Sequence, residues 1–122
     1  MVDLGRGGQA SKGSIAMAQV VWIKKANKKR IAFLAYGEKE FGVKAALKMN
    51  NRIMDYVRSL SDNPGMGAVE PLLQGRKKPY RSLVVHKLIK LVYYVDESRQ
   101  TVFIADLWDT RREPARLARP LG

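Results

Sequence analysis

The chain of 122 residues contains no cysteine. That absence excludes a disulfide scaffold, a thiolate metal site and a cysteine nucleophile, and it is compatible with a reducing compartment. Long apolar runs are missing too, since none approaches the ~18 residues that a transmembrane helix needs. The nearest candidate, residues 15–23, follows Arg6 and Lys12 as in a signal peptide, but Lys24 and Lys25 offer no small-residue cleavage site. We therefore expect a cytoplasmic protein without a membrane partner.

Acidic residues and histidine are scarce as well. The chain has 11 acidic against 23 basic residues, and its formal net charge of +12 attracts polyanions at long range. Nucleic acid, a ribosome, an acidic protein and an anionic membrane all fit that charge, and so does a merely solubilising surface. The single histidine, His86, falls at an expected turn and does not suit a Ser-His-Asp triad. No His/Asp/Glu cluster has metal-ligand spacing, so we expect no metal and no other cofactor.

The composition is that of one globular domain, with 46% apolar residues. Residues 1–17 alternate glycine with serine and polar residues and follow neither the period of a helix nor that of a strand. We expect them to be a disordered tail, or a remnant that precedes a natural start at Met17. The organised domain is expected over residues 18–118.

Two helices are expected after a short first strand at residues 20–23. The first helix should cover residues 26–40 and stop near Gly42. The second has an apolar stripe at helical spacing, suited to lying on a sheet, and Pro64 prevents its continuation. The stripe consists of Val43, Ala46, Leu47, Asn50, Ile53, Met54, Val57 and Leu60.

Three further strands are expected after a loop at residues 64–79. They cover residues 80–85, 88–95 and 101–107, with a tight turn at His86 and Lys87. Consecutive strands joined by short turns must be antiparallel. The sequence therefore predicts an α+β fold: an N-terminal strand, a helical hairpin and a three-strand antiparallel meander. The two helices pack on one face of a small, mostly antiparallel sheet, whose other face is left as a concave surface. Beyond the last strand we expect one helical turn around residues 114–117.

Four segments in this order resemble the RelE/ParE toxin family of type II toxin–antitoxin systems, the plasmid stabilisation type. They are residues 21–26, Phe41-Gly42 with Ala45-Ala46, residues 63–67 with Glu70 and Leu72, and Tyr80-Arg81 with residues 91–93, residues 108–112 and Pro114. The resemblance covers about residues 18–118. It implies the fold just described and an acidic antitoxin partner that is partly disordered until bound. Members similar to RelE cut messenger RNA in the ribosomal A site, whereas members similar to ParE inhibit DNA gyrase and have no recognised nuclease site.

The resemblance also implies candidate catalytic residues. Metal-free RNA cleavage needs groups that move protons and groups that offset phosphate charge. Arg81, Lys90 and either Arg111 or Arg112 fall where RelE-like toxins carry phosphate-binding cations. His86 is a candidate for proton transfer, although a solvated turn histidine is the alternative. Two positions depart from the pattern, because Leu83 replaces a second basic residue and no C-terminal tyrosine follows Trp108.

Candidate RNA-binding residues come from the basic run and the aromatic side chains. Lys25, Lys28 and Lys29 share roughly one side of the first helix, which suits either a phosphate-tracking patch or an ordinary solvated face. Tyr80 and Trp108 are candidates for stacking on bases, with packing against the sheet as the alternative. An ion pair from Asp109 to Arg111 or Arg112 would equally explain the segment after Trp108.

Three hypotheses remain open from the sequence. The favoured one is a toxin that acts as a ribosome-dependent messenger-RNA endonuclease. The second is a non-enzymatic inhibitor of DNA gyrase similar to ParE, and the third is a degenerate basic binding module of the same fold. The first and third predict salt-sensitive binding to RNA or ribosomes, and the second predicts loss of supercoiling with RNA left intact.

Overall fold

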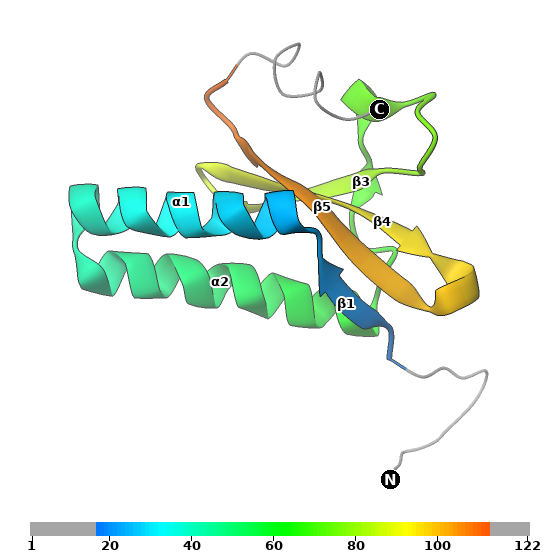
Figure 1. Ribbon diagram of the computed structural model, residues 1–122, viewed down its shortest axis with the longest axis horizontal. Helices are drawn as coiled ribbons and strands as arrows, with labels where there is room; N and C mark the ends of the chain where they lie inside the picture. Colours follow the sequence, from blue (N-terminus) through cyan, green and yellow to red (C-terminus); the bar gives the residue numbers. More distant parts are fainter. Residues whose placement is uncertain (1–16, 113–122) are drawn as a thin grey trace, which may run out of the picture.

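The computed structural model describes residues 17–112 as one layer of two helices on one sheet (Figure 1). The helices are α1 (Lys24–Phe41) and α2 (Val43–Asp62). The strands are β1 (Gln19–Trp22), β2 (Ala68–Val69), β3 (Arg81–His86), β4 (Ile89–Asp96) and β5 (Thr101–Asp109). Two single turns of 3₁₀ helix, η1 (Pro71–Leu73) and η2 (Glu97–Arg99), complete the order. The predicted α+β class and the helical hairpin are confirmed.

The sheet has five strands in the order β1-β5-β4-β3-β2. Strands β3, β4 and β5 pair antiparallel, as expected, and β2 also pairs antiparallel with β3, whereas β1 pairs parallel with β5. The prediction of one loop over residues 64–79 is wrong in part. Ala68 and Val69 pair there with Ser82 and Arg81 to form β2, a two-residue strand too short to give a sequence pattern.

A sharp reversal at Gly42 joins the two helices. Its φ of +94° lies in the region that favours glycine, and this residue ends α1 and begins α2 at once. Met49, Ile53, Val57 and Leu60 form the buried stripe of α2. The predicted stripe is wrong at its start, because the hairpin extends beyond the sheet (Figure 1). Val43 and Leu47 are therefore 57% and 58% exposed.

The main core lies between the helices and the sheet. The expected alternation along β4 is confirmed, because Ile89, Leu91 and Tyr93 enter this core while Val92 packs on the opposite face. A β-bulge interrupts the regular register at Ala105, since Val92 pairs with Asp106 and the next residue, Tyr93, pairs with Ile104. This extra residue keeps Ile104 and Leu107 both in the main core.

The opposite face of the sheet is only partly open. Leu73, from η1, is buried against Val92 and Trp108, and Tyr80 packs beside them. The expected concave surface is therefore at most part of this face, because the segment after β2 covers the rest and buries apolar side chains that the meander presents there.

Element boundaries differ from the predictions by at most two residues. The first helix begins at Lys24 rather than at residue 26, and the turn between β3 and β4 is formed by Lys87 and Leu88, with His86 still in the strand. Residues 1–16 of the tail expected over residues 1–17, and the turn expected at residues 114–117, lie outside the described residues. Within residues 17–112, neither helix has the length and apolar character needed to span a membrane.

Candidate functional site

Lys90 contacts a buried carboxylate on the partly covered face. Its Nζ lies 2.6 Å from Oε1 of Glu70, which is only 1% exposed. The same carboxylate accepts hydrogen bonds from the Ser82 hydroxyl at 2.7 Å and the Leu72 backbone N–H at 2.9 Å. Burial alone raises the pKa of Glu70, but these donors and the Lys90 charge together hold that pKa below its ordinary value. Lys90 thus neutralises an ionised group of the protein itself.

A second buried carboxylate, Asp106, forms ion pairs with two lysines of α1. Its oxygens lie 2.8 Å from Nζ of Lys29 and 3.3 Å from Nζ of Lys25, and Asp106 is fully buried. It also accepts hydrogen bonds from the Leu107 backbone N–H and from Nε1 of Trp108. The α1 helix is therefore pinned to β5 by charge as well as by packing.

Of the candidate RNA-binding residues, only Lys28 among the three α1 lysines is exposed and without an ion pair to any described residue. Trp108 is 1% exposed, and Nζ of Lys90 lies 5.8 Å from its ring centroid. The ring therefore joins the Glu70 and Asp106 clusters and offers almost no surface to a base. No local sequence pattern indicated that Glu70 and Asp106 would be buried, because the lysines that pair with them lie far along the chain.

Arg81 and Tyr93 hold the loop after α2. The Tyr93 hydroxyl donates to the Pro64 carbonyl at 2.7 Å and accepts from the Gly67 backbone N–H at 2.9 Å. Nη1 of Arg81 donates to the Gly67 carbonyl at 2.6 Å. Burial raises the pKa of Tyr93, so its hydroxyl stays protonated at neutral pH.

Arg81 and Lys90 lie on opposite faces of the sheet. Residues that pair directly across strands share a face, and Arg81 pairs with Tyr93, a main-core residue on the helix side. Lys90 contacts Glu70 and Trp108 on the other side. The fold thus does not bring these two candidate cations together at one phosphate.

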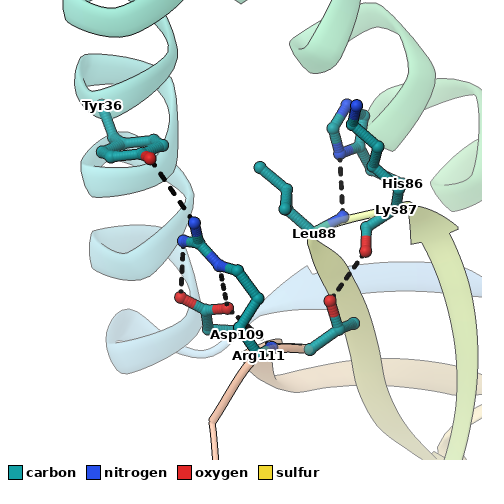
Figure 2. A network of polar contacts seen from close by, with 7 residues as sticks. Tyr36, His86, Lys87, Leu88, Asp109 and Arg111 are labelled. Carbon is teal, nitrogen blue, oxygen red and sulfur yellow. Dashed lines mark hydrogen bonds and ion pairs between the residues drawn. The ribbon is translucent and has the colours of Figure 1, made fainter.

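His86 also lies on the helix side. It pairs with Ile89 of the main core, and its Nδ1 accepts the Leu88 backbone N–H at 3.1 Å (Figure 2). Burial, with smaller contributions from Arg52 and Lys87, lowers the pKa of His86 below 6.5. The ring is half-buried at the end of β3 rather than solvated in the turn.

Arg111 forms a clamp between the end of β5 and α1, the first of the two ion pairs expected from the sequence. Its Nε and Nη2 donate to the two carboxylate oxygens of Asp109 at 3.0 and 2.9 Å, and its guanidinium lies over the Tyr36 ring (Figure 2). The Arg111 hydrogen bonds lower the pKa of Asp109, and the pair raises the pKa of Arg111. Arg112 is exposed, and only its backbone N–H contacts Asp109.

Tyr80 belongs to a half-buried aromatic row. Its ring meets Tyr94 edge-on at 5.7 Å, and Tyr94 stacks on Phe103 at 5.2 Å. Burial raises the pKa of Tyr80, with a smaller contribution from Tyr94. Nζ of Lys78 lies 5.2 Å from the Tyr94 ring centroid, at the edge of a cleft of about 670 Å³. Among residues 17–112 no group of three His, Asp or Glu side chains could hold a metal ion.

Comparisons with known proteins place this arrangement among toxins. The family model described as the ParE toxin of the type II toxin–antitoxin system parDE matches residues 20–114. No curated protein sequence matched the chain.

Three solved structures are similar in fold. A structure of the chromosomal ParDE system from P. aeruginosa has a TM-score of 0.62 at 20% identity, over 76% of this chain and 96% of that one. The YoeB/ParE toxin from Agrobacterium tumefaciens has a TM-score of 0.53 at 20% identity, over 75% and 96%. The YoeB dimer from Staphylococcus aureus has a TM-score of 0.52 at 19% identity, over 80% and 100%.

Proposed function

The chain belongs to the ParE toxin family of type II toxin–antitoxin systems, and from that premise we propose that it acts by binding DNA gyrase rather than by cleaving messenger RNA. Membership of such a system implies an antitoxin partner. The net charge of +12 suits an acidic segment that folds onto the toxin and neutralises that charge.

One observation carries the choice of binding over cleavage: the candidate catalytic cations are divided between the two faces of the sheet. A cleavage site needs its cations around one phosphate and a proton-transfer group within hydrogen-bond reach. Lys90 lies on the face that the η1 segment partly covers, where it neutralises Glu70. Arg81 and His86 lie on the helix side. No rotamer change moves a side chain through the sheet.

Two of the groups that could move protons, the Nδ1 atom of His86 and the hydroxyl of Tyr93, are held by hydrogen bonds. The His86 Nδ1 lone pair accepts the Leu88 backbone N–H. The Tyr93 hydroxyl is fully buried and uses both its donor and an acceptor site on Pro64 and Gly67.

The free end of the helical hairpin suits a protein partner. Here Phe41, Val43 and Leu47 are 57–60% exposed, and Tyr36 contacts Phe41 edge-on. We call these four residues the hairpin-end surface. Exposed apolar side chains that gather on one part of a small protein mark contact surfaces for other proteins. Gyrase is the target that ParE-like toxins would bind there.

The test is gyrase supercoiling of relaxed plasmid in the presence of the purified chain. We expect inhibition by the wild type and equal inhibition by His86→Asn, since the asparagine carbonyl can accept the Leu88 N–H but cannot exchange a proton near neutral pH. A Val43→Ser/Leu47→Ser variant should inhibit at least tenfold less while its melting temperature stays within a few degrees, because both side chains are already mostly solvated.

Two results would remove the proposal. Normal supercoiling at saturating wild-type protein would exclude gyrase as the target. Loss of toxicity in cells carrying His86→Asn, with the fold intact, would indicate that proton transfer by His86, and hence RNA cleavage, is needed for toxicity.

A further inference from the structure

A cleft at the end of the sheet farthest from the hairpin-end surface has no role in gyrase binding as proposed above. It has a volume of about 670 Å³, within the range of small-molecule sites. Three segments form it: the loop after α2, the chain that leads into β3, and the turn between β4 and β5. The lining residues used below are Lys77, Lys78, Arg81, Tyr94, Asp96 and Glu97.

The cations of this cleft differ from the four cations that are held by carboxylates in the site described above. Lys25, Lys29, Lys90 and Arg111 each contact a carboxylate. Within residues 17–112, by contrast, no ion pair joins Lys77, Lys78 or Arg81 to an acidic side chain. Three positive charges thus border the cleft around the end of the sheet, and the acidic residues of the same cleft, Asp96 and Glu97, form no ion pair with them.

The wall beside Arg81 is held in place before any ligand arrives. Tyr93 fixes the Pro64 carbonyl and the Gly67 N–H, and one guanidinium nitrogen of Arg81 fixes the Gly67 carbonyl. The rest of the guanidinium is left for the cleft. A positioned donor of this kind binds phosphate with less loss of side-chain entropy than a free surface arginine.

The aromatic ring of Tyr94 forms the base of the cleft. Tyr94 stacks on Phe103 with one face, and the Lys78 ammonium lies 5.2 Å from the centroid of the same ring. A flat base that stacks on Tyr94 displaces this ammonium, which then pairs with the ligand's phosphate. Stacking of this kind is worth roughly 1–3 kcal/mol per base by alanine substitution, or about fivefold to 150-fold in affinity.

The opposite wall is acidic and carries acceptors. Asp96 accepts from the Ser98 hydroxyl and the Arg99 backbone N–H, and its second oxygen pairs with Arg99, while Glu97 is exposed beside it. An acidic peptide would meet repulsion on this side. A nucleotide would not, since its sugar hydroxyls and amino groups are donors that carboxylates accept.

We propose that this cleft binds a free nucleotide, with its phosphates on Lys77, Lys78 and Arg81, its base on Tyr94 and its sugar or amino donors toward Asp96 and Glu97. The site lies at the opposite end of the molecule from the α1–α2 connection (Figure 1). The proposals of nucleotide binding and of gyrase binding can therefore be tested independently of each other.

The experiment is a titration of the ¹⁵N-labelled full-length chain with ATP, followed by amide chemical shifts. We expect saturable shifts confined to residues 64–65, 77–81 and 94–98. Inorganic tripolyphosphate should bind at least tenfold more weakly, because it has no base to stack. A Tyr94→Phe variant should keep the ATP affinity and Tyr94→Leu should lose about tenfold.

A matched pair of variants separates the site from general attraction. Lys77→Glu/Lys78→Glu should weaken ATP binding at least tenfold. Lys44→Glu/Lys48→Glu makes the same change in charge on the exposed far part of α2, and should change the affinity less than about threefold at physiological salt, where the Debye length is ~8 Å.

Three outcomes would overturn the proposal. Equal losses in the two charge variants would mean long-range attraction without a site. Equal affinity for tripolyphosphate and ATP would mean a plain anion site. Shifts with a single-stranded RNA octamer but none with ATP would assign the cleft to a nucleic-acid strand instead of a free nucleotide.

Discussion

Replacing Gly67 by alanine should destabilise the fold strongly, because the added methyl group would have no room. A Cβ at this position would lie 2.7 Å from the Tyr93 hydroxyl oxygen, 2.8 Å from Cε1 of the same ring and 2.8 Å from the Ser82 carbonyl oxygen. Tyr93 is fully buried and Ser82 is in the β3 backbone, so neither moves cheaply.

The magnitude follows from two costs. Overpacking of a filled core costs about 1–3 kcal/mol. Displacing the Tyr93 hydroxyl also weakens its bonds to Pro64 and Gly67, at about 0.5–1.5 kcal/mol each. These costs add to roughly 2–6 kcal/mol, and at about 4 °C per kcal/mol in a domain of this size the melting temperature falls by ~8–24 °C.

Gly65 provides the matched control, because a Cβ there meets nothing within 4 Å and its φ is not positive. Gly65→Ala should be neutral or stabilise by up to ~1 kcal/mol through the unfolded state. The assay is urea unfolding of both variants at pH 7. If the free energies of unfolding of Gly67→Ala and Gly65→Ala differ by less than ~0.5 kcal/mol, the result would contradict the close packing of Gly67 against Tyr93.

Three more predictions concern the buried charges and His86. Asp106→Asn should lower the free energy of unfolding in urea by about 1–3 kcal/mol, because two lysines lose a buried partner but remain partly hydrated. As a control, Lys28→Gln should change the free energy of unfolding by less than ~0.5 kcal/mol. Equal effects of the two substitutions would contradict the ion pairs that hold α1 to β5. The pKa of Glu70 is lowered on folding, so the stability it contributes is present above about pH 4.5 and is lost as the pH falls through the folded-state value. Glu70→Gln should therefore be less stable than wild type at pH 7, and the gap should narrow below pH 4.5; a constant gap would contradict this. For His86, NMR titration should give a pKa below 6.5, and Arg52→Gln should raise it, because the nearby positive charge is removed; a pKa that Arg52→Gln leaves unchanged would mean that burial alone acts.

Local patterns were enough to predict the elements that pack regularly. The alternation of Ile89, Leu91 and Tyr93 identified the core side of β4, and the spacing of Ile53, Val57 and Leu60 identified the core side of α2. These features depend only on neighbours along the chain.

Features set by distant neighbours could not be predicted. The exposure of Val43 depends on where the sheet ends, and the faces of Asp106 and Trp108 depend on the bulge at Ala105. The pairing of Lys25 with Asp106 joins residues far apart in sequence. The ion pair of Asp109 with Arg111 was foreseen because its partners are two residues apart.

The division of candidate cations between two faces likewise became visible only with the strand register. From the sequence, Arg81 and Lys90 were two basic residues on neighbouring strands, which suited one phosphate site. Their partners in the ladder, Tyr93 for Arg81 and Val84 for Lys90, place them on opposite sides. This register is what shifts the favoured function from RNA cleavage to protein binding.

We infer that the chain is toxic without cutting RNA. The most direct test of this inference is primer extension on a message in a purified translation system, with ribosomes present, at the protein concentration that abolishes gyrase supercoiling. We expect a full-length primer-extension product at that concentration. Codon-phased cuts that require ribosomes and disappear in Arg81→Ala would contradict it.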